Sequence, residues 1–174
     1  LTLEDMCMPI RSLTGTAMLL AIALLVQSLR LIIPIPPQVS LFLIGSLVST
    51  CIIVATWRFG LKSGLTIAWV TPVVAYLQGI MLPILPAILV VGLGSSLYAC
   101  WARFWQGKSM VLMVLCAVLS RLVVLYGGFS WLLSTINIPG PKASLLLFSM
   151  GWPQLVTGTA GIVLAAILMR RMRN

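Results

Sequence analysis

The stretch LTGTAMLLAIALLVQSLRLII, residues 13–33, is apolar over about the 20 residues that a helix needs to cross a bilayer core. The loop Pro34-Ile35-Pro36-Pro37 follows it and ends the segment, because proline cannot continue a helix. The chain as a whole has the same character: of its 174 residues, 61% are hydrophobic and 7% are charged. Soluble domains carry about 25% charged residues. The sequence therefore predicts an integral membrane protein.

Five further apolar segments follow the first one. Together they predict an all-α protein with one transmembrane domain over residues 1–174, a compact bundle of six membrane-spanning helices. The division between the third and fourth segments rests on Gln78-Gly79 and on the prolines Pro83 and Pro86. The predicted spans are 13–33, 39–57, 63–80, 84–105, 109–134 and 144–169.

The basic residues predict the orientation of this bundle. Residues 1–12 hold Glu4 and Asp5 and form a polar tail without the features of a cleaved signal peptide, so the first helix is expected to be retained. Arg30 and Lys142 fall on one side of the membrane, and Arg121 falls inside the fifth span. Because basic loops stay inside, both termini are expected in the cytoplasm of a bacterial cell whose inner membrane holds the protein. The residues of the basic side are Arg11, Arg58, Lys62, Arg103, Lys108, Arg170, Arg171 and Arg173.

Small residues recur at four-residue spacing in several segments, which places them on one helix face and lets a second helix approach closely. Ala17 and Ala21 have this spacing in the first segment, and Gln27 and Arg30 make its outer end polar. Elsewhere the same spacing predicts packing within the bundle. Those sets are Gly45/Ser49, Gly64/Ala68, Gly92/Ser96/Cys100 and Thr157/Gly161/Ala165.

The Ala17-x-x-x-Ala21 pattern, the polar helix end and the I-P-x-P-P loop of the phrase LRLIIPIPPQVSLFLIGSLV resemble the substrate-binding (S) component of energy-coupling factor vitamin transporters. The size of the chain and its predicted helix count agree with that family. The resemblance implies high-affinity binding of a small vitamin-like substrate. It also implies that Ala17 and Ala21 dock on a transmembrane coupling subunit, which two cytoplasmic ATPase subunits drive.

Arg121 is the clearest candidate for a binding residue. It falls near the middle of the fifth segment, where a charge costs at least about 2.5–3.5 kcal/mol, and no span contains Asp or Glu to pair with it. Two interpretations stay open. In the first, Arg121 bonds backbone carbonyls or hydroxyls such as that of Ser120, or the helix register differs and its side chain extends to the headgroups. In the second, it faces a wet cavity and binds an anionic or strongly accepting group of a ligand.

Other candidates fall near the predicted outer face, where amides could bond a heterocycle and indoles could stack on it. Tryptophans there are also ordinary membrane-interface residues, and Arg30 could reach the headgroups instead of a ligand. Pro34–Pro37 and Pro139-Gly140-Pro141 would act as rigid loops over the site. With Arg121, the predicted substrate-binding residues are Arg30, Gln27, Gln38, Tyr76, Gln78, Trp131, Asn137, Trp152 and Gln154.

Several functions are disfavoured by what the sequence lacks. There is no His and the only carboxylates are Glu4 and Asp5, so we expect no metal site, no cofactor and no enzymatic activity. The basic residues are scattered singly between apolar runs, which does not predict nucleic-acid binding. A phosphate-binding loop is also missing, so transport would need an external ATPase. The alternative is a structural or assembly protein of the bacterial inner membrane, which would retain no ligand.

Overall fold

The computed structural model describes residues 10–32, 37–79, 85–135, 144, 147–148 and 150–172. Within these ranges the regular structure is α-helical, which confirms the predicted helical class. The helices are α1 (Ile10–Ile32), α2 (Pro37–Phe59), α3 (Leu61–Leu77), α4 (Leu85–Phe104), α5 (Met110–Thr135) and α7 (Trp152–Arg171).

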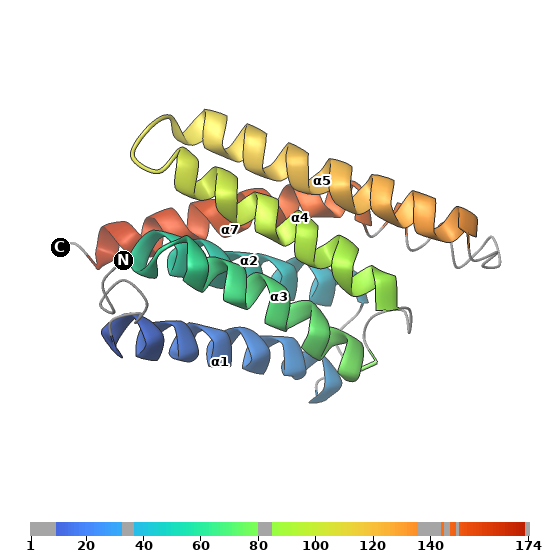
Figure 1. Cartoon of the computed structure of the whole chain (residues 1–174), viewed down its shortest axis with the longest axis horizontal. Helices are drawn as coiled ribbons and strands as arrows, with labels where there is room; N and C mark the ends of the chain where they lie inside the picture. Colours follow the sequence, from blue (N-terminus) through green and yellow to red (C-terminus); the bar gives the residue numbers. More distant parts are fainter. Residues whose placement is uncertain are drawn as a thin grey trace, which may run out of the picture.

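Five of these helices, α1, α2, α4, α5 and α7, are long and apolar enough to cross a membrane. The shorter helix α3 has 17 residues and contains Pro72. The helices lie side by side along the long axis of the molecule, with α1 at one edge (Figure 1). The start of α1, the end of α7, the α2–α3 turn and the α4–α5 turn lie at the same end of this bundle (Figure 1).

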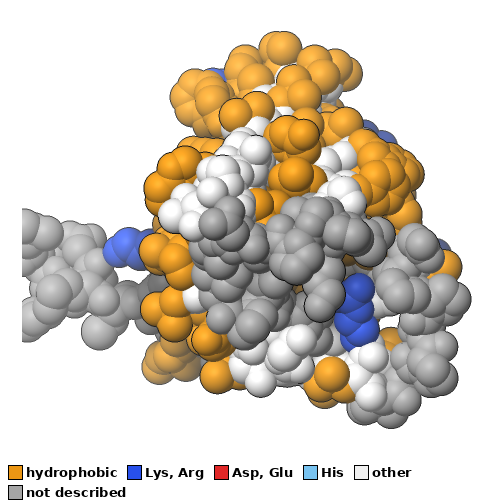
Figure 2. All heavy atoms as spheres, turned by 90° about the vertical axis from the view of Figure 1, so that its right-hand side faces the viewer, with side chains coloured by type: hydrophobic (Ala, Val, Ile, Leu, Met, Phe, Trp, Pro, Cys, Tyr) orange, Lys and Arg blue, Asp and Glu red, His pale blue; other side chains and the backbone are white. Residues whose placement is uncertain are grey.

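The opposite end of the bundle carries few charges among the described residues. Seen from there, the coloured side chains are mostly hydrophobic, with scattered blue ones and no red ones in view (Figure 2). Large apolar side chains are exposed along the outward faces of the helices, as bilayer contact requires. Helix lengths and surface together indicate a multi-pass membrane protein, and the six-span topology and its orientation stay predictions.

The predicted segments agree with the helices to within a few residues, with one correction. The sixth segment is not one helix from 144 to 169, because α7 begins only at Trp152. Ser144, Phe148 and Met150 are helical, but Gly151 is not, with φ −88° and ψ −124°. Pro153 follows in the first turn of α7, the part of a helix where proline is tolerated. The continuous hydropathy of the sixth segment therefore did not indicate the break in the helix at Gly151.

Helix α2 is at the centre of the packing and contacts α1, α3, α4 and α7. Its residues Ile52, Ile53 and Ala55 are fully or almost fully buried in a core that α4, α5 and α7 complete. A second core cluster between α4 and α5 contains Ala87, Leu125, Phe129 and Leu132.

The small residues predicted to mediate helix packing do lie at helix contacts. A Cβ built on Gly45 would lie 3.1 Å from a methyl carbon of Thr157, and one built on Gly161 would lie 2.6 Å from Ser49 Cβ. These two pairs join α2 to α7. Gly92 lies where α4 packs on α3, and a Cβ built on it would lie 2.8 Å from the Trp69 ring. The packing interpretation of these sets is therefore confirmed.

Candidate functional site

Arg121 projects from α5 into the interior of the bundle and is only 8% exposed. Its Nη1 donates a hydrogen bond of 2.9 Å to the Ser49 hydroxyl on α2. The centre of the guanidinium lies 5.0 Å from the centroid of the Tyr98 ring on α4, a cation–π distance. Its Nε is buried and has no hydrogen-bond partner among the described residues. The guanidinium is thus held in place with one donor unused.

Tyr98 extends this contact to a fourth helix. Its side chain is fully buried, and its hydroxyl donates a hydrogen bond of 2.6 Å to the Gly158 carbonyl on α7. Gly158 also packs closely on α5, since an added Cβ would lie 3.1 Å from a methyl carbon of Val118. We call Ser49, Tyr98, Arg121 and Gly158 the arginine cluster. It joins α2, α4, α5 and α7 at one point.

The charge of the arginine cluster is not neutralised by any carboxylate of residues 10–172, because the two acidic residues of the chain, Glu4 and Asp5, precede them. Hydrogen bonds to a hydroxyl and contact with an aromatic face reduce the cost of burying a cation, but they leave its net charge. The arginine cluster can therefore bind an anionic group or a strong hydrogen-bond acceptor.

Of the two interpretations of Arg121, the hydroxyl contact is present, but its partner is Ser49 and not Ser120. The Ser120 hydroxyl instead bonds the carbonyl of Ala117 in its own helix. Ser49 had been interpreted only as a small packing residue. Its polar role depends on the Arg121 side chain reaching α2 from α5, and the sequence carried no local signal for that contact.

Two predicted binding residues, Gln27 and Gln78, are brought together between α1 and α3. Gln27 Nε2 lies 3.3 Å from the Thr71 carbonyl and 3.4 Å from Gln78 Oε1. Gln78 Nε2 in turn donates a hydrogen bond of 2.8 Å to the Ser28 hydroxyl. These amides hold two helices together and lie in a different place from the arginine cluster.

The other predicted binding residues are dispersed. Trp131 is 68% exposed on α5, while Trp152 packs against Phe42 and Phe148 with ring centroids 5.6 and 5.8 Å apart. Gln154 is buried and has a partner. Arg30 and Tyr76 are half-buried near the α1 and α3 ends. The Gln38 side chain, Asn137 and the loop residues 33–36 and 139–141 lie outside the described residues.

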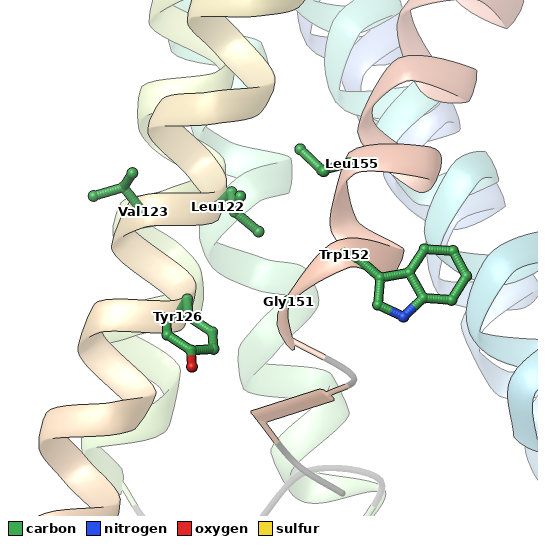
Figure 3. Close-up of a pocket in the computed structure, with 6 residues that line it drawn as sticks. All are labelled: Leu122, Val123, Tyr126, Gly151, Trp152 and Leu155. Atoms are coloured by element: carbon green, nitrogen blue, oxygen red, sulfur yellow. The ribbon is translucent and has the colours of Figure 1, made fainter. Parts of the chain in front are cut away.

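An apolar groove of about 350 Å³ lies between α5 and the start of α7. Tyr126 lines it from α5 and Trp152 from α7, on either side of Gly151 (Figure 3). Of the groove residues, only Trp152 was predicted as a binding residue. Tyr126 carries no sequence signal apart from its position one turn beyond Leu122. The groove residues are Leu122, Val123, Tyr126, Gly151, Trp152 and Leu155.

The described ranges contain no group of three or more His, Cys, Asp or Glu side chains that could hold a metal ion. The arrangement therefore offers a buried cation, hydroxyl and amide donors and an apolar groove, which are elements of binding sites. No family model matches the chain, and comparisons with curated proteins and with solved structures find no match.

Proposed function

We propose that the protein is the substrate-binding membrane subunit of a bacterial uptake system for a small, vitamin-like micronutrient. A transmembrane coupling subunit and two cytoplasmic ATPase subunits would energise it. The observation that carries the proposal is the buried Arg121, whose Nε has no partner in the described part of the chain.

The energetic argument concerns the cost of keeping this charge. A cation at the middle of a span costs at least about 2.5–3.5 kcal/mol. Ser49 and Tyr98 offset part of this cost through a hydrogen bond and a ring contact. An unbranched apolar side chain such as methionine would fill much of the same space without any charge to bury. A substrate carboxylate or phosphate that pairs with Arg121 would offset the remaining cost of burying the cation.

The position of α1 supports the partner in this proposal. Among the described helices, α1 packs mainly on α2 and α3, and it lies at the edge of the bundle (Figure 1). Ala17 and Ala21 are exposed on its outward face. A second protein could therefore approach the α1 backbone closely at these two residues.

The second candidate is a structural or assembly protein of the inner membrane. It is favoured by the dispersal of the predicted polar residues, since Gln27 and Gln78 bond each other between helices and the described groove is apolar. Under this alternative the arginine cluster only fixes the arrangement of four helices, and no small molecule is retained.

Mass spectrometry of small molecules released from the denatured protein separates the two candidates. Wild type, Arg121→Met and the control Arg170→Met, which removes an exposed charge in the last turn of α7, would be purified from the same cells. The substrate-binding function predicts a stoichiometric compound with an acidic or strongly accepting group in wild type and Arg170→Met, and its loss from folded Arg121→Met. Folded wild type without any retained or added vitamin-like ligand would instead support the scaffold.

A further inference from the structure

The α4–α5 turn carries a cluster of aromatic rings with a cation on it. Trp101, Phe104 and Trp105 lie on one face at the end of α4, with centroid distances of 6.0 Å for Trp101–Phe104 and 5.6 Å for Phe104–Trp105. Lys108 Nζ lies 4.5 Å from the Phe104 centroid and 5.6 Å from the Trp105 centroid. The lysine ammonium is thus held at the level of an aromatic belt, where lipid headgroups begin.

Hydrogen bonds fix this turn against the end of α2. Trp57 Nε1 donates to the Ala102 carbonyl at 3.0 Å, and Gln106 Nε2 donates to the Trp57 carbonyl at 3.3 Å. Arg103 donates to the side-chain oxygen of Gln106, so its guanidinium is held beside the same turn. Arg103 and Lys108 are both exposed. Both cations therefore belong to the same short turn at the basic end of the bundle, each held by its own contact.

This pair has no counter-ion within residues 10–172, which contain no carboxylate. Both exposed cations are therefore open to an anionic group of another molecule. On the membrane side of the pair the surface is apolar: Leu93, Leu97 and Phe104 share one face of α4 and are 53%, 39% and 59% exposed. A molecule that fits both parts has an anionic head and an apolar tail.

We propose that Arg103, Lys108 and the ring cluster bind the phosphate headgroup of an anionic phospholipid, whose acyl chain lies along Leu97 and Leu93. The continuity of cations, aromatic rings and lipid-facing leucines favours a lipid over an acidic protein segment, which would need no apolar stripe. Phosphate oxygens accept from the Arg103 and Lys108 donors, and the rings fix the depth of the headgroup. This site is separate from Arg121 and independent of the proposed transport function.

Spin-labelled lipids test this proposal in reconstituted membranes. The measured quantity is the association of labelled phosphatidylglycerol with the full chain relative to labelled phosphatidylcholine. We expect a preference for phosphatidylglycerol in wild type and a fall of about fivefold for each cation removed in Arg103→Ala and Lys108→Ala. Phe104→Leu keeps both charges and should lower the preference by a smaller factor, because the ammonium loses its platform.

The matched control is Arg170→Ala/Arg171→Ala, which removes the same charge at the end of α7. A site at the turn predicts that this control keeps most of the preference. Equal losses in this control and in the double variant Arg103→Ala/Lys108→Ala would indicate a diffuse surface potential and overturn the site. Absence of any preference for phosphatidylglycerol in wild type would also overturn the lipid site. An acidic protein segment would then be the better partner for the two cations. Full displacement of the lipid by soluble glycerol phosphate would show that the headgroup alone binds. It would contradict the proposed contact of the acyl chain with Leu97 and Leu93.

Discussion

At the scale of single residues, the Tyr98 hydroxyl is expected to stabilise the fold. Its hydrogen bond to the Gly158 carbonyl is fully buried, so Tyr98→Phe should lower the free energy of unfolding by about 0.5–1.5 kcal/mol. The same change at Tyr126, which is 49% exposed on α5, is the matched control and should have almost no effect. Denaturant titration of the protein in mixed micelles measures both. An equal effect of the two substitutions would contradict a specific role of the Tyr98 hydroxyl.

The sequence predicted that Arg121 lies within the fifth apolar helix but not what surrounds it. An arginine inside an apolar run indicates a costly charge wherever the helix lies, and the 8% exposure agrees with that. Its partner Ser49 is 72 residues away, and Tyr98 belongs to a third helix. Such contacts depend on which helices are neighbours, which a single apolar pattern does not encode. The same reason explains why Gln27 and Gln78 were predicted as ligand contacts although they bond each other.

At the scale of the helices, the contact of α2 with α7 depends on Gly161. A Cβ there would lie 2.6 Å from Ser49 Cβ and 3.2 Å from the Ser49 backbone carbon. Gly161→Ala should therefore force the helices apart and lower the free energy of unfolding by about 1–3 kcal/mol. Gly127 on α5 is the control, because an added Cβ meets nothing within 4 Å. Gly127→Ala should raise stability by up to about 1 kcal/mol through helix propensity. Thermal unfolding of the two variants checks the opposite signs, and stabilisation by Gly161→Ala would contradict the close contact.

Most helices were predictable because apolar runs of about 20 residues between turn residues have few other solutions in a membrane. The small-residue spacings also predicted helix contacts correctly, since close approach requires small side chains in any arrangement. The sixth segment was the exception. Gly151 has a non-helical conformation that interrupts the helix, and Pro153 follows in the first turn of α7, while the hydropathy of the run continues across both.

At the scale of the whole molecule, the distribution of charge follows the two ends of the bundle. The described basic residues at the end with the start of α1 and the end of α7 are Arg11, Arg58, Lys62, Arg103, Lys108, Arg170 and Arg171, whereas Arg30 lies near the end of α1 that faces the other way (Figure 1). This asymmetry predicts that the basic end is cytoplasmic, provided that α3 crosses the membrane. Helix α3 is the critical element, because its 17 residues give a length of about 25 Å, slightly less than the hydrocarbon core.

Cysteine accessibility tests whether α3 crosses. In a chain whose native cysteines are replaced by alanine, single cysteines would be inserted after Gly60, substituted for Leu77, which is 75% exposed, and substituted for Ser109. A charged maleimide that cannot cross the inner membrane should label Leu77→Cys in intact cells. The other two should react only after the membrane is opened, because an even number of crossings separates the α2–α3 turn from the α4–α5 turn. If Leu77→Cys and the Gly60 insertion react alike, α3 does not cross. The Ser109 cysteine would then lie on the opposite side of the membrane from the α2–α3 turn. The basic residues would be divided between the two faces of the membrane. That result would contradict the charge asymmetry on which the six-span topology rests.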